Sequence, residues 1–176
     1  TRLVYLKDNG GDENFHLYAV NQDGSNLKDL TPFEGVKADF VDELEDNDNE
    51  MLIQLNKDKK EVFDVYRLNI NTGELTKIAT NPGNITGWVT DHDGKLRVAV
   101  TTDGTNSSLL YRATEADTFT VVLTTNFKES VSPLFFDFDN KNLFASSNIG
   151  RDKAAIIKMD PSTGKEISLI FEHPDV

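Results

Sequence analysis

The stretch DVYRLNINTGELTKIATN, residues 64–81, carries the pattern that decides the fold. Apolar and polar residues alternate on both sides of Thr72-Gly73, and alternation with a period of two is typical of half-buried strands. The glycine supplies the positive φ that a tight hairpin turn needs. The stretch therefore predicts a β-hairpin.

The same hairpin recurs along the chain, and the repeat is the strongest signal in the sequence. Related stretches are HLYAVNQDGSNLKDLTP (16–32), LLYRATEADTFTVVLTT (109–125) and AIIKMDPSTGKEISLIFE (155–172). Three alignment columns share one period of about 44 to 49 residues: Tyr18, Tyr66, Tyr111 and Ile157; Leu3, Leu52, Leu96 and Leu143; and Phe40, Trp88 and Phe136.

Each full repeat has room for four short strands, which the second repeat places at 38–44, 51–56, 63–70 and 75–80. Four antiparallel strands at this period are typical of one blade of a β-propeller. A β-sandwich would explain the strands but not the long period. We expect an all-β fold, a single propeller fragment of about four blades whose first blade lacks its innermost strand. The expected blades are 1–35, 36–83, 84–129 and 130–176.

Composition excludes several classes of function. The chain of 176 residues has a formal net charge of −12 and a pI near 4.6, which disfavours binding to nucleic acid or an anionic membrane. It contains no cysteine, so disulfides, thiolate zinc sites and cysteine nucleophiles are excluded. It begins with Thr1 and shows no targeting segment, which indicates a piece of a longer chain and slightly favours a cytoplasmic location.

Carboxylates gather in YLKDNGGDENFHLYAV, residues 5–20, where Asp8, Asp12 and Glu13 have the chemistry of hard-cation ligands. The counterparts of this stretch in the other repeats lack matching carboxylates, and the calcium-loop spacing is absent. We interpret it as a solvated turn between two strands. The acidic run from Asp42 to Glu50 is likewise interpreted as a solvated face.

The histidines give no catalytic or metal pattern. His16 falls on a strand, His92 in a turn and His173 near the end, without a second ligand at zinc spacing. His92 lies between Asp91 and Asp93, which suggests a base with an orienting carboxylate. A turn of similar composition recurs without histidine in DFDNK, so turn chemistry explains it better. The sequence thus predicts no catalytic, cofactor-binding or metal-binding residue.

The innermost strands carry the aromatic column of Phe40, Trp88 and Phe136. We expect these rings, with Phe135 and Phe138, to form core between blades rather than to stack on a ligand. The alternate residues would then face the central channel of the propeller, and they are Asp39, Gly87 and Asp137.

Over almost the whole chain the sequence resembles the propeller of prolyl oligopeptidase-family serine peptidases, most closely the dipeptidyl aminopeptidase/acylaminoacyl-peptidase type. The resemblance rests on RLVYLKDNGGDENFHLYAVN, FDVYRLNINTGELT, NPGNITGWVTDHDGKLRVAV and ESVSPLFFDFDNKNLF. It implies a propeller that sits over the active site of an α/β-hydrolase domain and admits peptides selectively. Here no G-x-S-x-G nucleophile elbow surrounds Ser25, Ser107, Ser108 or Ser147, so no catalytic residue carries over.

We therefore expect a non-catalytic gating region, whose partners are the missing hydrolase domain and, in the full-length protein, peptide substrates. The alternative is a stand-alone binding propeller that acts as a protein-interaction scaffold. No cofactor is expected. Because a cut array of blades leaves an apolar face at each end, we also expect head-to-tail pairing of two copies, against an open monomer or a self-closed form.

Overall fold

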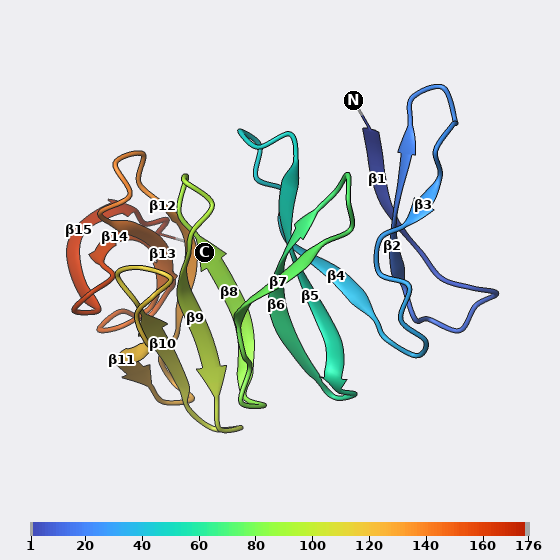
Figure 1. Ribbon diagram of the computed structural model, residues 1–176. Coiled ribbons are helices and arrows are strands. Elements are labelled where there is room, and N and C mark those ends of the chain that lie inside the picture. The colour runs from blue at the N-terminus through green and yellow to red at the C-terminus, as the bar shows by residue number, and fades with distance from the viewer. Residues whose placement is uncertain (1, 175–176) are drawn as a thin grey trace. The chain divides into compact units, whose positions relative to one another are not determined.

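The computed structural model describes residues 2–174, and every regular element in this range is a β-strand. Figure 1 shows the strands gathered into four separate antiparallel sheets. No helix long and apolar enough to cross a membrane occurs among the described residues. The predicted all-β fold is confirmed.

The sheets are meanders whose strands pair in chain order. The first sheet contains β1 (Arg2–Lys7), β2 (His16–Asn21) and β3 (Lys28–Asp29), and the second contains β4 (Ala38–Asp42), β5 (Glu50–Lys59), β6 (Val62–Asn69) and β7 (Leu75–Ala79). The third contains β8 (Ile85–Thr90), β9 (Leu96–Thr102), β10 (Ser107–Tyr111) and β11 (Thr120–Thr125), and the fourth contains β12 (Val131–Phe136), β13 (Leu143–Ser147), β14 (Ala155–Asp160) and β15 (Lys165–Phe171). Each sheet is one propeller blade, three-stranded in the first case and four-stranded in the others, as the sequence predicts.

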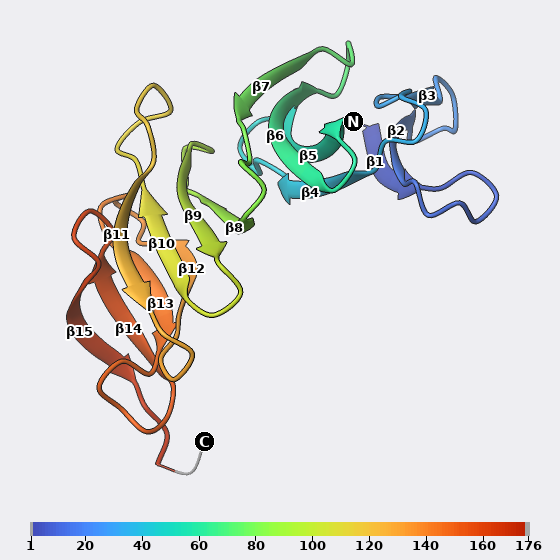
Figure 2. The same cartoon turned by 90° about the horizontal axis from the view of Figure 1, so that it is seen from below.

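The chain divides into two compact units, Thr1–Gly83 with the first two sheets and Asn84–Val176 with the last two. Figure 2 shows the curved second sheet and the β12–β15 sheet, one from each unit. We describe each unit by itself. The expected single body of 176 residues and its blade limits stay predictions.

In the first unit the first and second sheets bury an apolar layer between them. Leu17 and Ala19 of β2 pack with Ile53 of β5 and Tyr66 of β6, and all four side chains are buried. Along β2, buried and more exposed residues alternate, because successive side chains of a strand point to opposite faces.

In the second unit the equivalent layer lies between the third and fourth sheets. Val98 and Leu109 from the third sheet meet Leu143 and Ile157 from the fourth, and Phe136 is the largest side chain that this layer buries. The sheet β12–β13–β14 thus has one buried face, as its strict alternation along β13 and β14 indicates.

The strand pairing corrects two alignment columns. Tyr66 pairs with Ile53, and Met51, two residues earlier on that face, stands where Leu3 and Leu143 stand in their own sheets. Met51 therefore replaces Leu52 in the leucine column. The sequence alignment did not distinguish the two because both residues are apolar.

The tyrosine column needs the second correction. Tyr66 belongs to the core shared with the first sheet, whereas Tyr111 packs against the core shared with the fourth sheet. The third sheet has register shifts in both β8–β9 and β10–β11 pairing, and a shift by one residue moves a side chain to the opposite face.

The aromatic column is only partly core. Phe136 is 1% exposed, but Phe40 and Trp88 are half-buried, and Trp88 lies 5.9 Å from the ring of Phe119. Phe135 is 55% exposed and Phe138 is 92% exposed, so the expectation that these two rings are buried between blades is wrong. Phe135 lies beside Phe136 on β12 and therefore points to the opposite face.

Candidate functional site

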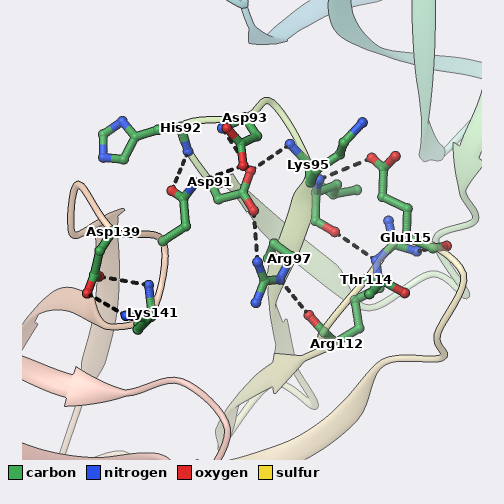
Figure 3. A network of polar contacts seen from close by, with 12 residues as sticks. Asp91, His92, Asp93, Lys95, Arg97, Arg112, Thr114, Glu115, Asp139 and Lys141 are labelled. Carbon is green, nitrogen blue, oxygen red and sulfur yellow. Dashed lines mark hydrogen bonds and ion pairs between the residues drawn. The ribbon is translucent and has the colours of Figure 1, made fainter.

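A buried ion pair belongs to a network of polar contacts in the second unit (Figure 3). Asp91 follows β8, and its Oδ2 accepts a hydrogen bond from Arg97 Nη1 at 2.8 Å while only 3% of the Asp91 side chain is exposed. The other oxygen, Oδ1, accepts the backbone N–H groups of Asp93 and Lys95, so the carboxylate also holds the β8–β9 turn. Asp91 is thus committed to structure on both oxygens.

Arg97 reaches this carboxylate from a bulge. The β8–β9 register shifts between Val89 and Thr90, which leaves Arg97 as an extra residue on β9. Its guanidinium lies 5.3 Å from the ring centre of Tyr111 and 5.4 Å from that of Phe136, between the third and fourth sheets. Burial disfavours its charge, but hydrogen bonds to Tyr111 and Asp91 outweigh this, and the pKa of Arg97 is raised.

Arg112 extends the network along the strand end. Its Nε donates to the carbonyl of Leu96 at 2.7 Å, and its guanidinium stacks 4.5 Å from the ring centre of Phe119. Burial lowers the pKa of Arg112, and the nearby carboxylates of Glu115 and Asp117 oppose that effect. Both arginines are therefore largely buried, with hydrogen bonds and aromatic rings around their guanidinium groups.

The β8–β9 turn is fastened to the β12–β13 turn. The backbone N–H of His92 donates to Asn140 Oδ1 at 2.9 Å, and Asn140 Nδ2 donates to Asp93 Oδ2 at 3.1 Å. The ring of His92 stacks on Phe138 and its Nε2 lies 2.9 Å from the carbonyl oxygen of Phe136. Figure 3 shows the two turns facing each other across these contacts.

This geometry does not form a catalytic group. The Nε2 atom of His92 contacts a backbone carbonyl and Asp91 is paired with Arg97, so the His–Asp arrangement suggested by the sequence does not form. The turn interpretation fits the geometry. The contacts of His92 with Asn140 and Phe138 indicate that it contributes to the packing of the two turns.

The other residues considered from the sequence have local partners of their own. Asp12 caps the β1–β2 loop by accepting the N–H groups of Asn9 and Asn14, which explains this polar stretch as a turn. His16 Nδ1 lies 2.8 Å from Asp29 Oδ2, a contact that sequence spacing did not reveal. Across residues 2–174 no group of three or more His, Asp or Glu side chains is placed to hold a metal ion.

The expected channel residues are engaged in pairs. Asp39 accepts a hydrogen bond from Gln54 Nε2 at 3.3 Å, and Asp137 forms an ion pair with Lys158. The hydrogen bond from Lys158 is the main reason that the pKa of Asp137 is lowered. Whether these side chains line a channel stays a prediction.

A cavity of about 530 Å³ opens in the first unit beside the acidic β4–β5 turn. Four carboxylates from the acidic run lie along it, and they are Glu43, Glu45, Asp48 and Glu50. Arg2 closes one side, where its Nη1 donates to the carbonyl of Ile70 at 2.7 Å. We interpreted this run from the sequence as a solvated face. In the structure, several of its carboxylates line the cavity.

The sequence analysis did not identify the two buried arginines of this network. Arg97 and Arg112 are the charged members of the network, and each stands at the end of an apolar strand segment, in LRVAV and LLYR. A charge within an otherwise apolar inner strand is a signal for a buried partner. The identity of that partner, Asp91, depends on the bulge and could not be derived from spacing.

The amino-acid sequence was compared with those of known proteins and protein families. No family model matches the chain. The chain is 33% identical to "Dipeptidyl aminopeptidase BIII" of Pseudoxanthomonas mexicana over 97% of its own length, which corresponds to 25% of that protein. The chain is a homologue of one quarter of a dipeptidyl aminopeptidase. The chain thus spans about a quarter of the curated relative it matches, and the resemblance derived from its sequence is confirmed to that extent.

Solved structures share the fold at low sequence identity. The chain superposes on puromycin hydrolase with a TM-score of 0.68 at 17% identity, over 97% of this chain and 29% of that one. A structure from a study of two prolyl endopeptidases gives 0.61 at 16% identity over 98% and 28%, and TolB from Acinetobacter baumannii gives 0.63 at 15% over 97% and 42%. These matches show the propeller fold, and the described residues contain only propeller blades.

Proposed function

We propose that this chain is a non-catalytic propeller portion of a serine peptidase, which filters the peptides that reach a separate catalytic domain. The observation that carries the proposal is the 33% identity to a dipeptidyl aminopeptidase along 97% of the chain. The polar network supports it indirectly, because Asp91 and Arg97 neutralise each other within the third sheet, and the Arg97 guanidinium also lies over the ring of Phe136 in the fourth sheet.

The contacts between two turns support the proposed filtering role, because a filter needs loops that hold their shape. The exchange of hydrogen bonds between Asn140 and residues 92 and 93 ties the β12–β13 turn to the β8–β9 turn. Loops fixed at both sides lose less conformational entropy when a substrate or a partner domain contacts them, which favours selectivity. The proposed partners are accordingly the α/β-hydrolase domain of the longer protein and its peptide substrates.

The test compares the full-length gene product with residues 1–176 on a panel of aminoacyl and peptidyl chromogenic substrates. We expect hydrolysis by the long protein and none by the short chain, which should also resist labelling by a fluorophosphonate. Stoichiometric labelling of the short chain would overturn the non-catalytic assignment. A long product that hydrolyses none of the substrates would overturn the peptidase assignment.

A second candidate is a stand-alone propeller that acts as an interaction scaffold. The likeness to TolB, of which the chain covers 42%, favours this candidate. The reading frame after Val176 distinguishes the two. A strand–G-x-S-x-G–helix segment followed by Asp and His supports the peptidase, and further blades alone support the scaffold.

A further inference from the structure

The loop between β1 and β2, residues 8–15, contains the pair Asn9-Gly10, and asparagine precedes glycine nowhere else in the 176 residues. Figures 1 and 2 both show this loop extending away from the strands of its sheet. Asn9 and Gly10 are exposed, and a Cβ at the Gly10 position would meet no atom within 4 Å. Water therefore reaches both the asparagine amide and the peptide nitrogen that follows it.

The conformation of the loop explains why a glycine follows Asn9. Gly10 has a φ of +71°, in the left-handed region that residues with a Cβ rarely adopt. The missing side chain also leaves the Gly10 nitrogen without the steric shield that a Cβ would provide. The residue that permits this loop thus also makes its own peptide nitrogen accessible.

Neither of the two groups is held by a hydrogen bond. Within residues 2–174, Asn9 forms one hydrogen bond, from its backbone N–H to Asp12 Oδ1 at 3.3 Å. Its side-chain amide and the backbone N–H of Gly10 form none in this part of the chain. The Gly10 nitrogen can therefore approach the amide carbon of Asn9 by bond rotation alone, without first losing a contact.

The aspartate–glycine pairs of the chain are held differently. In these pairs the glycine N–H donates a hydrogen bond of 2.9 to 3.0 Å, and they are Asp23-Gly24, Asp93-Gly94 and Asp103-Gly104. Their carboxylates are also ionised at neutral pH, which makes them poor targets for a nitrogen nucleophile. Asn9-Gly10 is the pair in which both the nitrogen and a neutral amide are free to react.

Asn106, which precedes the small residue Ser107, provides the comparison among the asparagines. Its Nδ2 donates to Asp103 Oδ2 at 2.9 Å. Ser107 lies on β10, where it pairs with Thr102 on one side and Thr125 on the other. The fold therefore holds both the amide of Asn106 and the backbone that follows it.

We propose that Asn9 is a modification site, at which the folded chain deamidates and isomerises without an enzyme. The Gly10 nitrogen loses its proton to hydroxide and attacks Cγ of Asn9. The N–Cγ bond forms while the Cγ–Nδ2 bond breaks, and Nδ2 takes a proton from water and leaves as ammonia. Water then opens the cyclic imide at one of its two carbonyl groups and yields either aspartate or isoaspartate.

The products change the charge of the loop and leave the sheet intact. The new carboxylate joins Asp8, Asp12 and Glu13 in the same loop, and isoaspartate adds one methylene to the backbone. The β1–β2 pairing ends at Lys7 and His16, so the longer backbone lies outside it. We therefore expect a slow conversion to a more acidic chain that keeps its fold.

Peptide mapping by mass spectrometry of the 176-residue chain, incubated at neutral and at mildly alkaline pH, tests the proposal. The peptide that contains Asn9 should gain about 1 Da as the amide becomes a carboxylate, and it should do so faster at alkaline pH. It should convert about tenfold faster than the peptide that contains Asn106, because glycine places no Cβ beside the nitrogen. A methyltransferase specific for isoaspartate identifies the isomerised product.

Variants of the pair and of the control separate this reaction from others. Asn9→Gln should slow the conversion about tenfold because its side chain must close a larger ring, and Gly10→Ala should slow it similarly because a Cβ shields the nitrogen. Asn106→Gln should leave the conversion of Asn9 unchanged. Unchanged circular dichroism of each variant shows that folding is retained.

Urea shows whether the fold sets the difference between the two asparagines. Unfolding should accelerate the conversion of Asn106, which loses its contacts, and should leave that of Asn9 nearly unchanged. Equal conversion of Asn9 and Asn106 in the folded chain would overturn the proposal. An acidic shift of the same rate in Asn9→Gln would also overturn it, because the new charge would then arise elsewhere.

Discussion

The two units use the same four-strand repeat, but they secure their paired sheets differently. In the first unit the turn after β4 is long and acidic and lies beside a cavity of about 530 Å³. In the second unit the corresponding turn after β8 is short, and its Asp91 points inward to Arg97. The comparison shows that the same turn position of the repeat can line an open cavity in one unit and hold a buried ion pair in the other.

The two units differ in how deeply the carboxylate of an aspartate–arginine or glutamate–arginine ion pair is buried. Asp91 is buried with Arg97, whereas Glu50 of the first unit lies 3.7 Å from Arg67 with 36% of its side chain exposed. An exposed pair contributes little to stability, and a buried pair becomes costly once one partner is lost. Four predictions follow from this contrast between the units, from the largest effect to the smallest.

Phe136→Ala should destabilise the second unit by about 3–5 kcal/mol, because a fully buried ring leaves a cavity. Phe40→Ala, at the same repeat position in the first unit, should cost less than half as much since Phe40 is half-buried. Urea unfolding followed by Trp88 fluorescence reports the second unit, and circular dichroism reports the strands of both units together. Equal losses would mean that the two cores are not secured differently.

Asp91→Asn should cost about 3 kcal/mol, because it leaves the charge of Arg97 largely buried without its counter-ion. Glu50→Gln in the first unit should change stability by less than about 1 kcal/mol. The same urea series measures both variants. A small effect of Asp91→Asn would show that the ion pair contributes little to the stability of the third sheet.

Gly164→Ala should cost about 2–3 kcal/mol. Its φ of +68° disfavours a side chain, and a Cβ there would lie 2.9 Å from Leu123 Cβ and from the carbonyl oxygen of Val122. Gly24→Ala is the control in the equivalent turn of the first sheet. Gly24 has a φ of +82° but open space around it, so only the backbone cost of about 1 kcal/mol applies.

Thermal unfolding compares the two glycine variants. The difference between them measures how closely the β14–β15 turn packs on β11. Identical melting shifts would contradict that close approach.

The smallest effect concerns two aspartates in equivalent β-hairpins, Asp58 near the end of β5 and Asp103 in the β9–β10 turn. Hydrogen bonds, chiefly from the backbone N–H of Asn106, lower the pKa of Asp103 to about 2, and the hydrogen bond from Lys77 is the main cause of the lowered pKa of Asp58. The stabilisation that Asp103 contributes is present above its ordinary pKa of 3.8 and is lost as pH falls toward 2. NMR titration of the side-chain carboxyls measures both values.

Salt and substitution separate the two causes. Added salt should raise the pKa of Asp58, which depends on the Lys77 charge, and leave that of Asp103 nearly unchanged. Asn106→Ala should raise the pKa of Asp103 only in part, because the backbone donor remains. A strong response of Asp103 to salt would show that charge, and not neutral hydrogen bonds, lowers its pKa.

The sequence by itself determined the class of fold and its internal order. Alternation with a period of two requires strands, and glycine at Gly24, Gly73 and Gly164 marks the hairpins because each has a positive φ. The strands predicted for the second blade agree with β4 to β7 within a few residues. The repeat therefore gave the number and order of strands, since both follow from local chemistry.

Only the tertiary structure decided which faces are covered and which charges meet. Tyr111 packs against the core shared with the fourth sheet although it aligns with Tyr66, and the bulge at Arg97 brings that side chain to Asp91. Apolar neighbours such as Met51 and Leu52 look equivalent in sequence, yet they point to opposite faces. Bulges and packing between sheets depend on the sum of many weak contacts, so no single stretch of sequence encodes them.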